Sequence, residues 1–452
     1  MKKIRLNTIF LIVIFLTIPF VTIFGNNPIN IKFTIKHYNG TALNIKIGNE
    51  TNKVIINNNG EGAIDLLLDK PTYGKLLIDN FNSYPLFLVP GTKLMISFLT
   101  NDKKVDSLKF TGDLSRENTF LQNPRNYSFG KVTINTKDDE SKNSEMLDSL
   151  IKENQKKLEA QKLSETFKNL EKERIRYLSY KRLTMNYSIN DANVTHFTSL
   201  LKSKMIENPD LMVIDEYLDF LISANKQLNY FAKGKISIEG DENRRNRVNQ
   251  IVQNTKTPQI LSYLVDDVLF PVVQNGEPAD LIALYFKYVT DPKRIEALNK
   301  CLTAFERIKK GKPCPPFSFK DTNDHLVSLK ELQGKYVYID FWATWCGPCK
   351  GEIPHMQMLE DKFKGKNICF VSISVDKNSD IQAWKKMIAE NKMGGFQLHL
   401  GENWPWLKNF MPGNISIPRF LLLDKNGDFI SSNMSRPSDE QTAVTINGLP
   451  GL

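Results

Sequence analysis

Two cysteines separated by two residues, Cys346 and Cys349, are the residues of this sequence most suited to chemistry. They follow an apolar run of strand length, residues 336–342, and precede a segment with helical spacing. The Cys-x-x-Cys spacing places both sulfur atoms in the first turn of that helix, close enough to form a disulfide with little backbone movement. Such a pair at a strand-to-helix junction is typical of a redox dithiol.

The two thiols are predicted to have different roles. Cys346 stands at the helix entrance, where unpaired backbone N–H groups and the helix dipole stabilise a thiolate, so it is the predicted nucleophile. Cys349, one turn inside, is expected to resolve the mixed disulfide by attacking the Cys346 sulfur. Pro348 fixes φ in the first turn. Asp340 is a carboxylate inside an apolar strand, where burial would raise its pKa and let it take the proton of Cys349; a polar strand-end residue is the alternative.

A buried strand, a helix and a second buried strand must position this pair. The nearly continuous apolar runs 336–342 and 368–375 are typical of strands covered on both faces of a sheet. The helix between them continues through Phe363, with Pro354 as a predicted kink, so the three elements form a βαβ unit. Residues 419–424 and 428–430 flank an Asn-Gly turn and predict a closing hairpin.

The string from Phe341 to Lys350, Phe-Trp-Ala-Thr-Trp-Cys-Gly-Pro-Cys-Lys, resembles the active-site string of the thioredoxin superfamily. Residues 312–435, under a third of the chain, resemble more particularly the exported TlpA/ResA-like thiol-disulfide oxidoreductases. This second resemblance rests on Pro315-Pro316-Phe317-Ser318-Phe319, Val327-Ser328-Leu329, Gly334-Lys335, Glu352 with Pro354, Val375-Asp376 and Ile417-Pro418.

The resemblance implies roles for individual residues. Pro418 would be a cis-proline facing the dithiol, which exposes the Ile417 backbone for strand-like pairing with a substrate peptide. Glu352 corresponds to the family's acidic residue beside the active site and would tune the pKa values of the two thiols, with an ordinary first-turn acid stabilised by the helix dipole as the alternative. Trp345 would cover the sulfur atoms and present an apolar docking surface, and Gly347 would help to shape the turn between the cysteines.

The resemblance also implies an enzyme that reduces protein disulfides through a redox-active Cys346–Cys349 disulfide, fed by a membrane-linked electron donor and needing no other cofactor. The direction of electron flow depends on a reduction potential that is not readable from the sequence. One alternative is a binding or scaffold protein whose redox domain acts on a single bound partner. A thiol peroxidase is another, disfavoured because the two thiols are paired.

The remaining cysteines and the end of the chain depart from this pattern. Cys301 and Cys369 stand in helical and apolar strand sequence and are predicted to be structural. Cys314 stands where the family usually has a small residue, and a third redox thiol is the alternative to a structural role. A zinc site is disfavoured because the sequence has no second cysteine pair, and Lys350 excludes the covalent haem signature. No clear helix follows Ser435.

The first residues predict export. Lys2, Lys3 and Arg5 precede an uncharged apolar run, residues 8–24, that ends at a Gly-Asn-Asn-Pro break. Residues 1–25 are therefore a predicted signal peptide, or an N-terminal membrane anchor if they are retained, and no cysteine follows for lipid attachment. We expect the protein in the periplasm or cell envelope of a bacterium.

The remaining sequence predicts a multidomain α+β and α/β architecture. Short alternating runs over residues 26–122 predict an antiparallel β-sandwich-like domain, and this region is similar to a poorly characterised β domain that precedes redox modules in some bacterial proteins. Residues 123–143 are a predicted linker. Residues 144–310 form a predicted helical region, whose Lys/Glu-rich helices over 144–182 are expected to be solvated faces. A stiff basic hinge, residues 309–316, leads into a thioredoxin-like domain at 311–452.

Composition excludes several classes of protein. The chain has 452 residues, enough for several domains, and its 24 Gly and 21 Pro exclude collagen-like and low-complexity chains. Its five cysteines are too few for a disulfide-stapled scaffold. The net charge of +10 is mild over this length and includes three basic residues of the export segment, so we expect no nucleic-acid partner.

Overall fold

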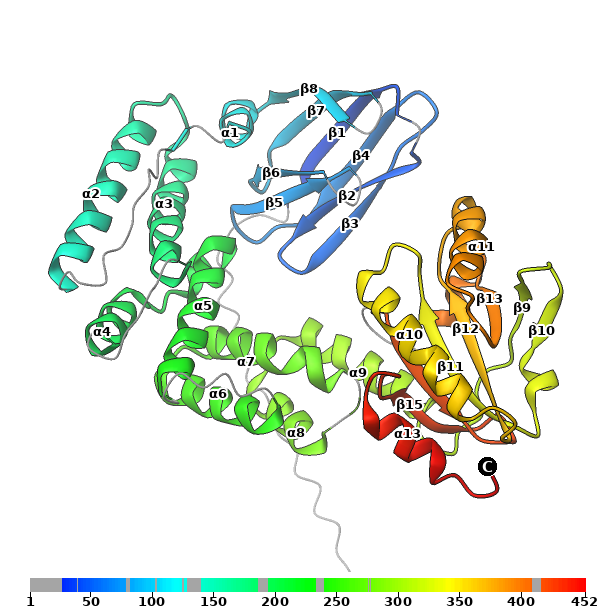
Figure 1. Ribbon diagram of the computed structural model, residues 1–452. Coiled ribbons are helices and arrows are strands. Elements are labelled where there is room, and N and C mark those ends of the chain that lie inside the picture. Colours follow the sequence, from blue (N-terminus) through cyan, green and yellow to red (C-terminus); the bar gives the residue numbers. More distant parts are fainter. Residues whose placement is uncertain are drawn as a thin grey trace, which may run out of the picture. The chain divides into compact units, whose positions relative to one another are not determined.

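The computed structural model describes residues 27–452 apart from 39, 79–81, 102–103, 124–125, 128–139, 186–193, 233–239, 275, 277 and 409–415. The predicted export segment and most of the predicted linker therefore lie outside the described residues. The chain divides into two compact units, Met1–Ala232 and Lys233–Leu452, whose elements are labelled in Figure 1. This boundary lies inside the predicted helical region 144–310 rather than at the basic segment 309–316.

Two four-stranded β-sheets open the first unit, with strand orders β4-β1-β7-β8 and β3-β2-β5-β6 (Figure 1). Along β1 the side chains alternate between the core and the surface, and inward-facing residues of both sheets share one hydrophobic core, as the alternating sequence pattern predicts. The strands are β1 (Ile29–Lys36), β2 (Ala42–Ile47), β3 (Glu50–Ile55), β4 (Glu61–Leu66), β5 (Thr72–Leu77), β6 (Ser83–Leu88), β7 (Lys93–Asn101) and β8 (Lys104–Gly112).

One strand pair corrects the prediction of an antiparallel domain. β1 pairs with β7 in parallel, with Ile31 opposite Leu94, whereas the other described pairs of this unit are antiparallel. A parallel pair needs a long crossover connection, and strands β2 to β6 lie between β1 and β7 in the sequence. Alternation within a strand predicts which side chains are buried but carries no information about the direction of the neighbouring strand.

Helices complete the described part of the first unit, and the helical segment begins at Glu140, slightly before the predicted start at 144. Leu158, Phe167 and Ile175 from these helices join the hydrophobic core of the two sheets, so part of the predicted helical region packs with the β-sheets. The helices are α1 (Ser115–Leu121), α2 (Glu140–Glu159), α3 (Glu165–Met185), α4 (Val194–Lys204), the 3₁₀ helix η1 (Pro209–Val213) and α5 (Asp215–Ala232).

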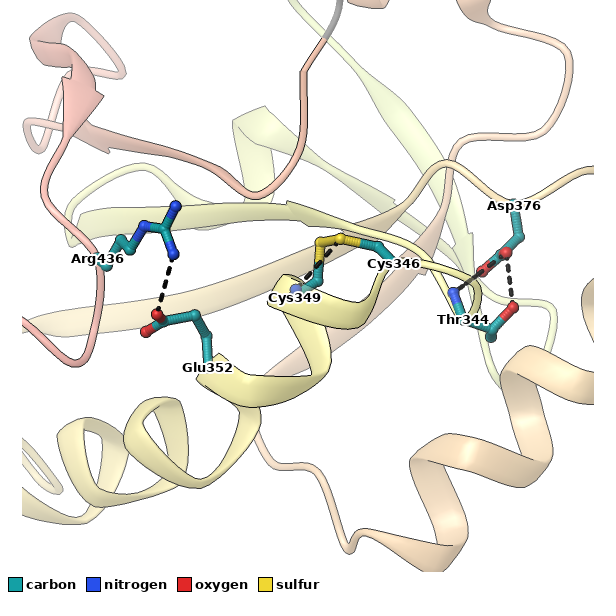
Figure 2. The surroundings of a disulfide bond; sticks show 6 residues. All are labelled: Thr344, Cys346, Cys349, Glu352, Asp376 and Arg436. Carbon is teal, nitrogen blue, oxygen red and sulfur yellow. Dashed lines mark hydrogen bonds and ion pairs between the residues drawn. A yellow bond between two sulfur atoms is a disulfide. The ribbon is translucent and has the colours of Figure 1, made fainter. Parts of the chain in front are cut away.

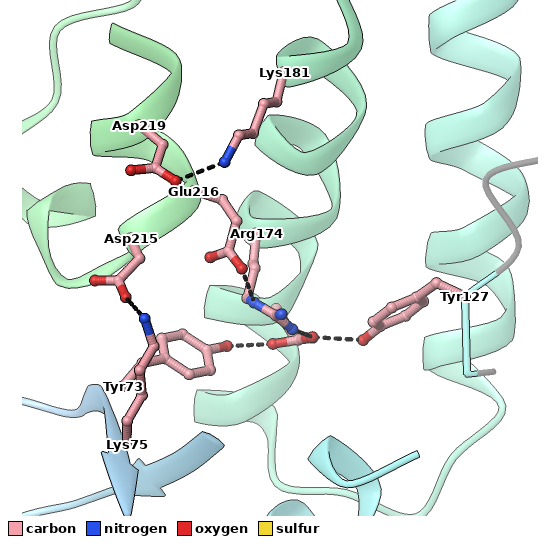
Figure 3. Close-up of polar contacts among 9 residues, drawn as sticks. Tyr73, Lys75, Tyr127, Arg174, Lys181, Asp215, Glu216 and Asp219 are labelled. Atoms are coloured by element: carbon pink, nitrogen blue, oxygen red, sulfur yellow. Dashed lines mark hydrogen bonds and ion pairs between the residues drawn. The ribbon is translucent and has the colours of Figure 1, made fainter. Parts of the chain in front are cut away.

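A buried polar network also joins the sheets to the helices (Figure 3). Glu171 of α3 has no exposed surface, and its carboxylate accepts hydrogen bonds from the hydroxyls of Tyr73 on β5 and Tyr127. Arg174 lies 2.7 Å from Glu171 and 2.9 Å from Glu216 on α5, so one guanidinium links two carboxylates. The charge of Glu171 is therefore an exception to the expectation that the Lys/Glu-rich helices over 144–182 are solvated amphipathic faces.

Four helices open the described part of the second unit: α6 (Asp241–Asn254), α7 (Pro258–Val273), α8 (Ala279–Tyr288) and α9 (Pro292–Glu306). Asp291 caps α9 by accepting from the backbone N–H groups of Lys293 and Arg294. The segment 309–316, predicted as a hinge, is paired along its backbone: Gly311 N–H donates to Phe429 O at 2.7 Å, and Cys314 N–H donates to Gly427 O at 2.9 Å.

A seven-stranded mixed sheet follows, in the order β10-β9-β13-β12-β11-β14-β15 (Figure 1). Every residue of its central parallel strands, β11 and β12, is buried, which confirms the prediction from the apolar runs. The elements are β9 (Ser318–Asp321), β10 (Leu326–Ser328), η2 (Leu329–Leu332), β11 (Tyr336–Trp342), α10 (Gly347–Lys362), β12 (Ile368–Ser374), η3 (Asn378–Asp380), α11 (Ile381–Glu390), β13 (Phe396–His399), α12 (Trp404–Lys408), β14 (Arg419–Leu423), β15 (Phe429–Met434) and α13 (Glu440–Asn447).

The end of the chain differs from its sequence pattern. Strands β14 and β15 form the predicted antiparallel hairpin, but a helix, α13, follows where the sequence indicates no clear helix. Asp439 caps α13 by accepting from the Gln441 backbone N–H, and Ile446 is fully buried against the sheet core. A single cap and few apolar positions make this short helix hard to detect before its packing is known.

Candidate active site

The two cysteines lie at the junction of β11 and α10 and form a disulfide, with their Cα atoms 5.3 Å apart (Figure 2). Cys346 is the N-cap residue of α10, and its sulfur accepts the backbone N–H of Cys349 at 3.2 Å. The two side chains retain only 5% and 3% of their accessible surface. A thiolate formed at Cys346 on reduction would keep this N–H donor and the positive end of the helix dipole.

Asp376 anchors the loop that leads into Cys346, a role that the sequence pattern did not predict. Its carboxylate, fully buried just after β12, accepts the Thr344 hydroxyl at 2.8 Å and the Thr344 backbone N–H at 3.0 Å (Figure 2). β11 and β12 are parallel neighbours, so their carboxyl ends meet at one edge of the sheet. A charged residue directly after an apolar strand was the available sequence signal.

Asp340 lies within β11 and is 8% exposed. Its Oδ1 atom is buried without a hydrogen-bond partner. Loss of solvation by burial, and secondarily the nearby Glu352 carboxylate, raise the pKa of Asp340 to about 8. A carboxyl group with such a pKa exchanges a proton near neutral pH, which is the property that the predicted proton carrier needs.

Glu352, one turn beyond Cys349 on α10, is 7% exposed and firmly held. It accepts the backbone N–H of Ser438 at 3.0 Å and the Ser438 hydroxyl at 2.9 Å. Arg436 lies 3.7 Å from the same carboxylate (Figure 2). The first turn of α10 contains no acidic residue, so the first-turn alternative for Glu352 is wrong. Both of its partners lie between β15 and α13, where the sequence indicates no element.

The predicted docking residues lie next to the cysteines in the sequence or on the segment that precedes β14. Trp345 is 64% exposed, and Ile417 packs against the hydrophobic cluster that contains both cysteines. The Ile417–Pro418 peptide bond is cis and directly precedes β14. Gly347 and Pro348 form the first turn of α10 between the cysteines. Substrate contact by these residues stays a prediction.

The other three cysteines are free and buried. Burial raises the pKa of the Cys314 thiol to about 12 and that of Cys369 to about 11, and it also raises the pKa of Cys301. A buried, protonated thiol is a poor nucleophile, which disfavours the alternative of a third redox thiol at Cys314.

Among the described residues, no helix is long and apolar enough to cross a membrane.

Comparisons with known proteins agree with this site. A family model for the AhpC/TSA family matches residues 310–431. The thiol-disulfide oxidoreductase ResA of Bacillus thuringiensis is 31% identical over 139 residues, which are 31% of this chain and 78% of that protein. ResA of Bacillus subtilis is 38% identical over 77 residues, which are 17% of this chain and 43% of that protein.

Two solved structures from Bacteroides vulgatus are also similar. The solution structure of a protein assigned as a thiol-disulfide oxidoreductase is 48% identical, covers 31% of this chain and 90% of its own, and has a TM-score of 0.28. The thioredoxin domain of another thiol-disulfide oxidoreductase is 26% identical, covers 31% of this chain and 96% of its own, and also has a TM-score of 0.28.

The similarity to ResA spans 78% of the Bacillus thuringiensis protein. The family match over residues 310–431 includes the Cys346–Cys349 pair with the strand and helix beside it. The protein is thus an oxidoreductase. The carboxy-terminal domain of this chain belongs to the ResA/TlpA-like thiol-disulfide oxidoreductases of the thioredoxin superfamily.

Proposed function

We propose that the protein is an exported oxidoreductase that reduces disulfide bonds in other proteins. The observation that carries the proposal is the Cys346–Cys349 disulfide at the entrance of α10, where the Cys346 sulfur accepts a backbone N–H. The reduced form of such a pair holds two electrons for a substrate disulfide.

The reaction proceeds in two exchange steps. The Cys346 thiolate attacks one sulfur of the substrate disulfide, and the other substrate sulfur leaves as a thiolate. Cys349 then loses its proton and attacks the Cys346 sulfur, which releases the second substrate sulfur and forms the Cys346–Cys349 disulfide. The substrate gains two electrons and, at neutral pH, two protons, and a donor at the membrane reduces the enzyme again.

Asp340 is the proposed acceptor of the Cys349 proton. Its carboxyl group, with a pKa of about 8, changes protonation state near neutral pH. The nearby Glu352 carboxylate is, after burial, the second cause of that raised pKa. Glu352 therefore acts through Asp340, whereas Asp340 exchanges the proton.

The substrate is proposed to dock as an extended peptide. The backbone of Ile417, before the cis-proline Pro418, would pair with it, while the exposed indole of Trp345 would cover its apolar side chains. Export rests on the basic and apolar pattern of residues 1–25, as a signal peptide or membrane anchor, and places the protein in the bacterial periplasm or cell envelope.

Two alternatives are kept. The two sheets before residue 123 share one core, consistent with a β-sandwich-like binding module, and the redox domain would then act on one bound partner. The second alternative is a thiol peroxidase. We keep it because of the AhpC/TSA family match, although the pairing of the two cysteines argues against it. We expect no nucleic-acid partner and no cofactor other than the redox-active disulfide.

Trapping separates these functions. Cys349→Ser in the full chain is expected to leave a mixed disulfide on Cys346, with Cys346→Ser as the matched control that traps nothing. A general reductase reduces insulin disulfides and traps many proteins, whereas a scaffold fails on insulin and traps one. Oxidation of the dithiol by hydrogen peroxide at a rate above that for insulin would favour the peroxidase. No insulin reduction and no trapped protein would overturn the proposed function.

A further inference from the structure

We propose that Asp376 is a positioning residue for the dithiol: it clamps the loop before α10 through Thr344 and thereby holds Cys346 at the helix entrance. This inference rests on the proposed dithiol chemistry. The residue that it adds, Asp376, lies outside the Cys-x-x-Cys motif, in the segment that follows β12.

The carboxylate of Asp376 is itself fixed. It has no exposed surface, and both of its oxygens accept the Thr344 backbone N–H, at 3.2 Å and 3.0 Å. Oδ1 also accepts the Thr344 hydroxyl at 2.8 Å, and Oδ2 accepts the Ser374 hydroxyl at 2.7 Å. The Ser374 oxygen in turn accepts the Asp376 backbone N–H at 3.0 Å. Such a group of charge-assisted hydrogen bonds restricts both partners.

The solvent side of the loop offers little other support. Trp345 is 64% exposed, and nothing lies within 4 Å of the position that a Cβ atom on Gly347 would take. On the inner side, Val375 N–H donates to Trp342 O at 2.9 Å, and Cys346 N–H donates to Ala343 O at 3.0 Å. The hydrogen bonds from Thr344 to Asp376 lie between these points, in the middle of the loop (Figure 2).

The position of this loop affects the reactive sulfur. The Cys346 sulfur accepts the Cys349 N–H while Cys346 keeps the extended N-cap conformation, with φ −82° and ψ 102°. If Thr344 is released, Cys346 gains alternative conformations in which that donor is lost. A reactive group held in place by a supporting hydrogen bond is more effective than the same group in a mobile loop.

The direct test changes the hydrogen bonds between Thr344 and Asp376 and leaves the Cys-x-x-Cys motif intact. In the full chain with Cys349→Ser, Thr344→Val removes the hydroxyl at constant shape, and Thr344→Ser keeps it. Alkylation of Cys346 by iodoacetamide is measured across pH. Thr344→Val is expected to slow alkylation at pH 7 about three- to tenfold, as for a lost hydrogen bond, and to move the pH midpoint upward. Thr344→Ser is expected to restore the original profile.

Asp376→Asn separates positioning from charge. If Asp376 acts by positioning, this variant moves the midpoint upward as Thr344→Val does. If only its buried negative charge matters, Asp376→Asn moves the midpoint downward and Thr344→Val leaves it unchanged, which would overturn the proposal. Unchanged profiles with a lowered melting temperature would also overturn it. Alkylation needs no substrate, so failure of the proposed function appears separately, as the absence of insulin reduction by the unmodified chain.

Discussion

Glu171 and Asp340 are both carboxylates buried in the protein interior, one in each compact unit, and their surroundings are opposite. Glu171 accepts from Tyr73, Tyr127 and Arg174 and has no exposed surface. Asp340 has a buried Oδ1 atom without a partner and a pKa raised to about 8. A satisfied buried charge stabilises one arrangement of a structure, whereas an unsatisfied carboxyl is held near its neutral form and can exchange a proton.

The two buried carboxylates therefore suit different roles, Glu171 a structural one and Asp340 a chemical one. Burial together with the Glu171 charge raises the pKa of Tyr73 and of Tyr127, so their hydroxyls stay protonated and keep donating. The network then links β5, α3 and α5, and both carboxylate oxygens of Glu171 are occupied by hydrogen bonds. In the second unit the unsatisfied atom belongs to β11, the strand that leads to the dithiol, and the proposed role of its carboxyl group is to exchange a proton.

The largest effect is expected for the satisfied carboxylate. Glu171→Ala removes the acceptor of two tyrosine hydroxyls and one of the two carboxylates that pair with Arg174, and it should lower the free energy of unfolding of the first unit by about 3–5 kcal/mol. Glu173→Ala, the matched control, breaks a partly exposed pair with Arg176 at 3.0 Å and should cost less than about 1 kcal/mol.

Denaturant unfolding of the full chain, with hydrogen exchange to assign the transition to residues 165–185, measures both changes. Insulin reduction per folded molecule should be unchanged by either variant. Similar losses of stability for the two variants would show that the Glu171 network has no special role.

Sequence alone could predict the dithiol because its chemistry is local. Cys346 and Cys349 are three residues apart, and Asp340 stands out as a charge within an apolar run. The Glu171 network could not be predicted, because Tyr73 lies 98 residues away and Tyr127 lies 44 residues away. Glu171 also stands among charged residues that are typical of an exposed helix.

Distance along the sequence also explains why the other contacts were not predicted. Asp376 lies 32 residues from Thr344, and Ser438 lies 86 residues from Glu352. The parallel pairing of β1 with β7 likewise joins distant segments. Burial patterns within one strand or helix were accurate for β11, β12 and the β14–β15 hairpin, whereas pairings between distant segments depend on tertiary packing that periodicity does not encode.

The next largest effect is expected for the unsatisfied carboxyl. Asp340→Asn keeps the shape but cannot take a proton, so resolution of the mixed disulfide should slow about 100-fold. Attack by Cys346 should be little changed, so the mixed disulfide accumulates in single-turnover reduction of a model disulfide. Asp361→Asn, an exposed carboxylate on α10, is the matched control. An equal slowing of both steps would contradict the proton-carrier role.

Stability should depend on pH in the direction that the raised pKa requires. Folding raises the pKa of Asp340 from its usual value near 4 to about 8, so between these values the folded state holds a proton that the unfolded state has lost. The contribution of Asp340 to the free energy of unfolding is therefore complete below about pH 4. This contribution falls as pH rises towards 8, by at most about 1.4 kcal/mol per pH unit.

The measurement compares wild type with Asp340→Asn in the disulfide form, where neither Cys346 nor Cys349 titrates. Asp340→Asn removes the titrating group, so its stability relative to wild type should increase steadily between about pH 4 and pH 8. A constant difference across this range would mean that Asp340 keeps an ordinary pKa in the folded protein.

The smallest effects are expected at Glu352, which is intermediate between the two carboxylates because it is buried but held mainly by one residue. Ser438→Ala removes a hydroxyl that donates at 2.9 Å and leaves the backbone donor at 3.0 Å, so it should cost about 1 kcal/mol. Arg436→Ala removes a half-exposed partner 3.7 Å away and should cost less than about 0.5 kcal/mol. Thermal unfolding of the oxidised protein ranks the two variants, and a larger loss for Arg436→Ala would mean that the ion pair, rather than the buried hydrogen bonds, holds Glu352 beside the dithiol.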